Sequence, residues 1–220
     1  MRVDGAAAVL LHGSVVRGQQ RPDSDIDLLV VTDDNRRQLP RHQALDGFDV
    51  EAIVGTSSEW QGRLDRDQPT LTYAWAEARP LDDPAGVGAT LVKYARNRLD
   101  TYTTPDIVRQ NLRQWWQHVA PKLAASRDRT DVEAGIAAAI SLDKIIETLF
   151  AVNNRPNPPA ASTPRRLALL TDLTVPAGLH DLFAAATTGT AHQRAHACLQ
   201  LIDQTPPLLD RPAEEAAAET

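Results

Sequence analysis

The sequence predicts an α+β protein, in which an N-terminal α/β domain is followed by an all-α bundle. Short apolar runs bounded by turn residues occur before residue 55, and such runs are typical of strands. After residue 87, apolar residues recur three and four positions apart, as in amphipathic helices. A segment rich in proline and glycine, residues 79–86, lies between the two patterns. We therefore expect domains at residues 1–88 and 89–205, followed by a flexible acidic tail at 206–220.

The N-terminal part alternates between expected strands and turns. Residues 36–44 are expected to form a short helix that Pro40 interrupts. Thr56, with Glu59 three residues later, has the pattern of a capping box and predicts the start of a helix. Residues 73–78 are compatible with a strand or a helical turn. The strands themselves are expected at residues 6–11, 26–31 and 48–54.

The C-terminal part is expected to be helical throughout. Pro105 suits the first turn of a helix, where its missing N–H is not needed. Asp131 is a good N-cap for the strongest helix of the chain, which is rich in Ala and Ile. The expected helices cover residues 90–102, 105–118, 132–152, 165–173, 179–186 and 190–204.

Composition narrows the class of protein. With 42% hydrophobic and 24% charged residues among 220, the chain fits a soluble globular protein. No apolar run reaches the length of a membrane span, and no secretory signal is visible, so we expect a cytoplasmic protein without a membrane partner. The single cysteine, Cys198, rules out an internal disulfide and a cysteine-based zinc site, and it is expected to be a packed small hydrophobe.

Two carboxylates open the second expected strand. Asp25 and Asp27 are separated by one residue, so their side chains point to the same face of a strand. Neighbouring carboxylates repel each other, and a divalent metal ion between them explains the pair better than an exposed, solvated pair does. Upstream, Gly13-Ser14 and Gly18 form a turn of small residues whose backbone N–H groups suit a phosphate. The pattern indicates phosphoryl or nucleotidyl transfer.

Gly13-Ser14, Gly18 and Ser24-Asp25-Ile26-Asp27, taken in this order, resemble the signature of the DNA polymerase β-type nucleotidyltransferase superfamily. Within it, the compact antibiotic (aminoglycoside- and lincosamide-like) and minimal nucleotidyltransferases with a C-terminal helical bundle are the nearest likeness. The resemblance implies a mixed sheet, a catalytic domain at residues 1–88 and a bundle that binds the acceptor. It further implies a third carboxylate from a neighbouring strand, which is Asp49 or Glu51. Glu51, further into the strand, is favoured.

The resemblance also implies a reaction. An acceptor hydroxyl would attack the α-phosphorus of a nucleoside triphosphate, with ATP favoured, and release pyrophosphate. The expected metal ligands are Asp25, Asp27 and Glu51, holding two Mg²⁺ ions, with Asp49 kept as an alternative third acid. The residues expected to bind the nucleotide are Gly13, Ser14, Arg17, Gly18 and Ser24, the last by shaping the turn, and Arg21 is a further candidate for the phosphates.

The acceptor is expected to be small. Residues 1–90 hold 9 Lys and Arg against 15 Asp and Glu, so the whole net charge of −6 lies in the part with the metal motif. Because a polymer-binding enzyme needs cationic surface against phosphates, this favours a small hydroxylated molecule over tRNA, although a local basic groove stays open. On the long helix, Asp143 and Glu147 share a face, as a solvated stripe or an anchor for the acceptor.

Three functions compete. The leading hypothesis is transfer of a nucleoside monophosphate, AMP favoured, to an antibiotic-like small molecule. The second is a toxin-type nucleotidyltransferase that modifies tRNA or a protein in a toxin–antitoxin system. The third is a non-catalytic nucleotide-binding subunit, which loss of the third carboxylate would favour. A homodimer is compatible with each of them. The spacing of Arg113 and His118, which helical ribonucleases use, is interpreted as coincidence.

Overall fold

The computed structural model describes residues 5–33, 42–45, 47–66, 68–125, 131–158, 169, 173, 175 and 179–210. The chain forms two compact units, Met1–Thr101 and Tyr102–Thr220, each with its own hydrophobic core. The helix expected at 165–173, most of the one expected at 36–44 and the tail beyond Asp210 lie largely outside the described residues. The domain boundary after residue 88 stays a prediction, while the packing groups helix α3 (Val87–Asp100) with the first unit.

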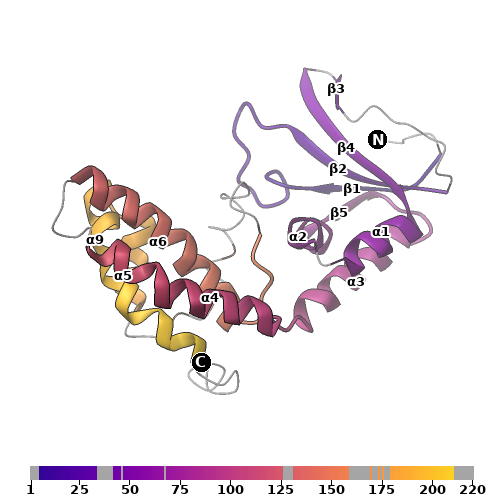
Figure 1. Ribbon diagram of the computed structural model, residues 1–220. Coiled ribbons are helices and arrows are strands. Elements are labelled where there is room, and N and C mark those ends of the chain that lie inside the picture. Colours follow the sequence, from indigo (N-terminus) through magenta and orange to yellow (C-terminus); the bar gives the residue numbers. More distant parts are fainter. Residues whose placement is uncertain are drawn as a thin grey trace. The chain divides into compact units, whose positions relative to one another are not determined.

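The first unit is built on a mixed five-stranded sheet with the strand order β3-β4-β2-β1-β5 (Figure 1). Strands β2 and β4 run parallel, and the other neighbouring pairs are antiparallel, which confirms the expected mixed sheet. The strands are β1 (Ala6–His12), β2 (Ile26–Thr32), β3 (His42–Leu45), β4 (Phe48–Thr56) and β5 (Arg79–Asp82).

Strand β3 corrects one prediction. The short helix expected to reach residue 44 is wrong for residues 42–44, because His42–Leu45 pairs antiparallel with the start of β4. Gly47, at φ +84°, sits in the turn between the two strands, where a residue without a Cβ adopts a left-handed conformation at little cost. The sequence signal was Asp46-Gly47, a common hairpin dipeptide that outweighs weak local helix propensity.

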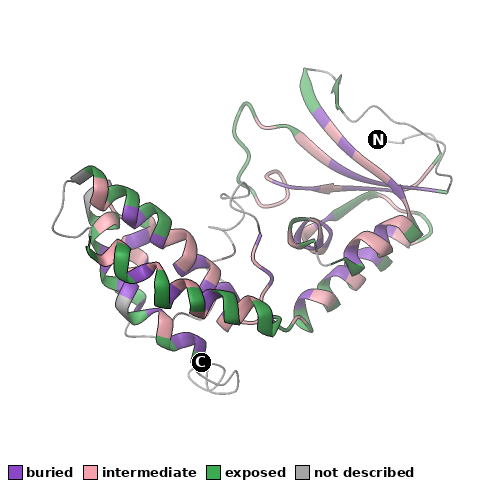
Figure 2. Ribbon diagram, in the orientation of Figure 1, coloured by how far each residue is buried: buried purple, intermediate pink, exposed green. Residues whose placement is uncertain are grey.

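One face of the sheet is covered by three helices, α1 (Ser57–Asp65), α2 (Pro69–Glu77) and α3 (Figure 1). Alternate residues of the strands, such as Leu10 of β1 and Leu29 of β2, pack against these helices together with Trp60 and Trp75. The two central strands β1 and β2 are accordingly among the most buried parts of the unit (Figure 2). The intervening strand residues, such as Leu28, form a second apolar cluster on the opposite face.

Local signals explain where the helices of this unit begin. The capping box is confirmed: Thr56 Oγ1 accepts the Glu59 N–H at 3.3 Å, and Glu59 Oε2 accepts the Thr56 N–H at 2.8 Å. The segment 73–78, left open between strand and helix, is helical up to Glu77, in a helix that Pro69 starts. Glu77 is therefore placed at the C-terminal end of α2.

The second unit is a helical bundle. Its core includes Leu112, Trp116, Leu149, Phe150 and Leu201. The described helices are α4 (Asp106–His118), α5 (Ala120–Ala124), α6 (Asp131–Val152), α8 (His180–Thr188), α9 (Ala191–Gln204) and the 3-10 helix η4 (Pro206–Asp210). None of the helices in the described ranges combines the length and apolar character that crossing a membrane requires.

The flexible tail expected from residue 206 is wrong for its first five residues, which form η4. Leu208 and Leu209 are buried in the core of the bundle, because apolar side chains gain about 1.5–3 kcal/mol each from leaving water. Arg113 fixes this segment by donating to the Leu209 carbonyl at 2.7 Å and to Asp210 Oδ1 at 3.0 Å. Arg113 thus has a structural partner of its own.

Other side chains singled out in the bundle are engaged in packing. Trp116 is buried and donates its indole N–H to Thr148 Oγ1 at 3.0 Å. Glu147 pairs with Lys144 at 2.5 Å on α6, and both side chains are half-buried. Cys198 is buried, as expected, and burial raises the pKa of its thiol to about 11. These three side chains thus have partners or a packed environment within the bundle, and the expected role of Asp143 and Glu147 toward an acceptor stays a prediction.

Candidate metal and phosphate site

Three carboxylates meet near the starts of the two parallel strands. In the parallel register Asp27 of β2 lies opposite Glu51 of β4, and Asp25 immediately precedes β2. One carboxylate oxygen from each of Asp25, Asp27 and Glu51 lies within 4.8 Å of the other two. Asp25 is exposed, and Asp27 and Glu51 are half-buried. The acidic cluster is thus preassembled by strand pairing.

Alternation along the strands places this acidic cluster on the helix-covered face of the sheet. Asp27 shares its face with Leu29, and Glu51 shares its face with Ile53, both of which pack toward the helices. Asp49 is two residues before Glu51 and is exposed, and it is not among the described residues that form the cluster. The structure therefore brings together Asp25, Asp27 and Glu51, and leaves Asp49 outside.

Gly13 brings the turn after β1 against the acidic cluster. It has φ +79°, in the left-handed region, and a Cβ built on it would lie 2.0 Å from Asp27 Oδ2. No side chain fits in that space, because real Cβ contacts do not fall below about 3 Å in packed proteins. Only glycine allows the backbone and the carboxylate to approach this closely. The expected neighbourhood of the glycine turn and the aspartate pair is present in the structure.

The turn itself exposes a row of unbonded donors. Its internal hydrogen bonds run from Arg17 N to Gly13 O at 3.3 Å, from Gly18 N to Val15 O at 3.2 Å, and from Gln19 N to Ser14 O at 2.9 Å. The N–H groups of residues 14–16 have no hydrogen-bond partner within the described part of the chain. Successive free N–H groups in a turn form a concave site for an anion.

Ser14 adds a side-chain donor to this turn. Its hydroxyl oxygen is buried and has no hydrogen-bond partner among the described residues. A buried hydroxyl without a partner costs about 1–3 kcal/mol, and a ligand oxygen would relieve that cost. Gly18 closes the turn at φ +66°, with open space where a Cβ would be, so its requirement for glycine comes from the backbone alone.

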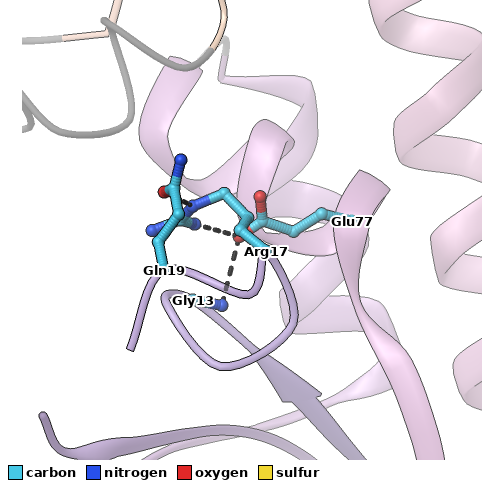
Figure 3. A network of polar contacts seen from close by, with 4 residues as sticks. All are labelled: Gly13, Arg17, Gln19 and Glu77. Carbon is cyan, nitrogen blue, oxygen red and sulfur yellow. Dashed lines mark hydrogen bonds and ion pairs between the residues drawn. The ribbon is translucent and has the colours of Figure 1, made fainter. Parts of the chain in front are cut away.

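Gly13 and Arg17 do not stand free, as Figure 3 shows. Glu77 Oε1, at the end of α2, accepts the Gly13 N–H at 3.1 Å and Arg17 Nη1 at 2.7 Å. Arg17 Nε donates to Gln19 Oε1 at 3.0 Å. The Gly13 N–H is thus hydrogen-bonded within the protein, and the unbonded row among the described residues begins at Ser14; phosphate binding by Gly13 stays a prediction. No spacing in the sequence pointed to Glu77, which is 60 positions from Arg17.

The remaining loop residues make local contacts. Ser24 Oγ accepts the Arg21 N–H at 2.8 Å, and the Ser24 N–H returns a bond to the Arg21 carbonyl at 3.0 Å. Arg21 is largely exposed and lies 3.4 Å from Asp23. Ser24 thus shapes the turn that leads into Asp25, as the sequence suggested.

Sequence reasoning missed two histidines beside the acidic cluster. His12, the last residue of β1, is buried and pairs with Asp27 in the antiparallel register. His42 of β3 has its Nε2 3.9 Å from Glu51 Oε1. His12 directly precedes Gly13-Ser14, so its position beside the motif was visible in the sequence, whereas His42 lay in a segment interpreted as helix.

The donor set fits a hard divalent cation. Carboxylates are the ligands that Mg²⁺ and Mn²⁺ prefer, and the cluster offers three of them, with Asp25 exposed to solvent. A cavity of about 560 Å³ lies on the other face of the sheet, lined by Leu28 and Val50 among others. None of the three clustered carboxylates lines it.

The similarity of this chain to known proteins is distant over its whole length and clearer over its N-terminal part. No curated protein matches the sequence. Among solved structures, the chain is similar to a nucleotidyltransferase-like protein from Exiguobacterium sibiricum 255-15, with 14% identity and a TM-score of 0.42. That likeness covers 94% of this chain and 69% of the other.

The family comparison concerns the part of the chain that contains the site. Residues 2–71 match the family described as the nucleotidyltransferase domain, and this range includes the glycine turn and all three clustered carboxylates. This segment of the first unit is therefore similar to nucleotidyltransferase domains, as the glycine turn and the aspartate pair predict. The general chemistry of this class is the transfer of a nucleoside monophosphate from a nucleoside triphosphate.

Proposed function

We propose that the protein is a Mg²⁺-dependent nucleotidyltransferase that moves AMP from ATP to a hydroxyl group of a small molecule, such as an antibiotic, and releases pyrophosphate. The observation that carries the proposal is the acidic cluster of Asp25, Asp27 and Glu51 beside the Gly13-Ser14 turn. Carboxylates that hold metal next to unbonded N–H groups that accept phosphate are what a metal–triphosphate complex requires. Cytoplasm, where ATP is abundant, is the compartment in which we place the reaction.

The roles of the residues follow from their positions. Asp25 and Asp27 would hold the metal ions, and Glu51 would complete the set of ligands or accept the proton of the attacking hydroxyl. The N–H groups of residues 14–16 and the Ser14 hydroxyl bind the outer phosphates. When bound, the two Mg²⁺ ions neutralise charge on the leaving pyrophosphate and lower the pKa of the acceptor hydroxyl.

The choice of a small acceptor rests on charge. The first 90 residues carry a net charge of −6, and the residues after them carry none. Long nucleic acids bind through many phosphate contacts to Lys and Arg, and this distribution gives such contacts little support. A small or cationic hydroxylated molecule meets no such barrier.

The test is release of pyrophosphate from each of the four NTPs, with Mg²⁺ and a panel of aminoglycosides, lincosamides, tRNA and protein. We expect release with ATP and a small acceptor, and a loss of roughly 100-fold or more in Asp25→Asn/Asp27→Asn, because metal ions contribute several kcal/mol to such transition states. Glu51→Gln should be impaired similarly, and Asp49→Asn should retain activity.

The same assay separates the alternatives. Release that appears only with tRNA or a protein acceptor would replace the small-molecule proposal by the toxin-type function. Binding of nucleotide without release with any acceptor would support a non-catalytic subunit. Full activity of the double aspartate variant would contradict the mechanism.

A further inference from the structure

A carboxylate from a distant helix holds the phosphate turn. Glu77 Oε1 contacts two parts of the turn at once, the Gly13 N–H at 3.1 Å and Arg17 Nη1 at 2.7 Å (Figure 3). The side chains of Glu77 and Arg17 are only 20% and 19% exposed, so this ion pair is shielded from bulk solvent. Charge-assisted hydrogen bonds of this kind are stronger than neutral ones.

The position of the Glu77 carboxylate, at the end of a helix, does not by itself stabilise that helix. It is the last residue of α2, whose last turn contains no basic residue. The C-terminal end of a helix carries a partial negative charge, so a carboxylate there is repelled. The contacts of Glu77 with the glycine turn, rather than any stabilisation of α2, therefore explain why a carboxylate is present at this position.

These contacts set the geometry of the nucleotide side of the site. Bonding the Gly13 N–H to α2 fixes the residue on which a Cβ would collide with the Asp27 carboxylate. Arg17 is held on one side by Glu77 and on another by Gln19. Its Nη2 atom has no hydrogen bond to any described residue, so one edge of the guanidinium is available to an anion.

We propose that Glu77 is a positioning residue that holds Gly13 and Arg17 in the arrangement that receives the triphosphate beside the metal-binding carboxylates. This inference rests on the proposed function for the identity of the ligand, but not for the effect on the turn. Glu77 itself does not touch the nucleotide. It acts through Arg17, whose outer edge contacts the phosphates, and through the backbone of the turn.

The experiment uses the full chain and compares Glu77→Gln with Asp100→Asn. Glutamine keeps an oxygen for the Gly13 N–H and removes the ion pair with Arg17. Asp100 is the matched control, because it is also a carboxylate at the last residue of a helix, α3, and it is exposed. Two quantities are measured: amide hydrogen exchange of residues 13–19 without ligand, and the Kd of α,β-methylene ATP with Mg²⁺.

For Glu77→Gln we expect exchange in residues 13–19 to accelerate, and nucleotide binding to weaken, each by about tenfold, with exchange elsewhere in the first unit unchanged. Arg17→Ala should weaken binding similarly. The double variant should bind no more than about twofold worse than Arg17→Ala, because residues that act through one contact are not additive. A merely structural role would instead accelerate exchange across the whole unit and give additive losses.

The outcomes keep this inference apart from the proposed function. Failure of the wild-type protein to bind any nucleotide would refute the proposed function, while exchange of the turn would still decide whether Glu77 holds it. Wild-type nucleotide binding combined with unchanged exchange in Glu77→Gln would overturn the positioning role. Tighter nucleotide binding by Glu77→Gln would overturn it too, since the carboxylate would then oppose the triphosphate.

Discussion

At the scale of single residues, the site depends on two glycines with left-handed backbones that are needed for different reasons. Gly13 has φ +79° and its missing Cβ leaves room for Asp27 Oδ2. Gly18 has φ +66° and open space around it. Position 13 therefore requires glycine both for its left-handed backbone and for the close approach of the Asp27 carboxylate, whereas position 18 requires it for the backbone alone.

Substituting each glycine by alanine separates these two requirements. Both variants should lose about 1–2 kcal/mol of unfolding free energy, because an L-residue is strained in the left-handed region. Only Gly13→Ala should also displace the Asp27 carboxylate and abolish pyrophosphate release. Chemical denaturation and the release assay measure the two effects. Equal activity of Gly13→Ala and Gly18→Ala would contradict the close approach.

At the scale of elements, local signals specified some boundaries and long-range pairing specified others. The capping box at Thr56 set the start of α1, as the sequence predicted. A second capping box, Thr190 with Gln193, starts α9 in the other unit. The strand β3 was missed because its four residues have no clear strand pattern of their own, and the hairpin dipeptide Asp46-Gly47 that precedes β4 was the only local signal of its pairing.

The two capping boxes predict similar local effects in different units. Thr56→Ala and Thr190→Ala should each lower unfolding free energy by about 1 kcal/mol, because each removes an acceptor from an otherwise unbonded helix N–H. Hydrogen exchange should accelerate at the start of α1 in the first variant and at the start of α9 in the second. Unchanged exchange at both helix starts would show that packing, and not the caps, holds these ends.

The candidate site was predictable from the sequence only in part, because long-range strand pairing brings some of its residues together. Asp25 and Asp27 could be paired from strand alternation alone, and Gly13-Ser14 lay close to them in sequence. The register of β2 and β4 was needed to bring Glu51, rather than Asp49, into the cluster. The role of Glu77 depends on where α2 ends relative to β1, which no local pattern encodes.

At the scale of the whole molecule, two units with separate cores divide the chain. The first 90 residues, which contain the carboxylate cluster, carry a net charge of −6. Clustered acids repel each other at neutral pH, and a bound cation removes that repulsion. The proposed function therefore depends on whether the cluster takes up a divalent metal ion.

The most direct measurement is a titration with Mn²⁺, which carboxylates bind in the same way as Mg²⁺ and which electron paramagnetic resonance detects. With α,β-methylene ATP present, the wild-type protein should take up Mn²⁺ saturably, and Asp25→Asn/Asp27→Asn should bind it about 100-fold more weakly. Asp49→Asn should bind as the wild type does. Equal Mn²⁺ affinity in the wild-type protein and the double aspartate variant would contradict the proposed metal site.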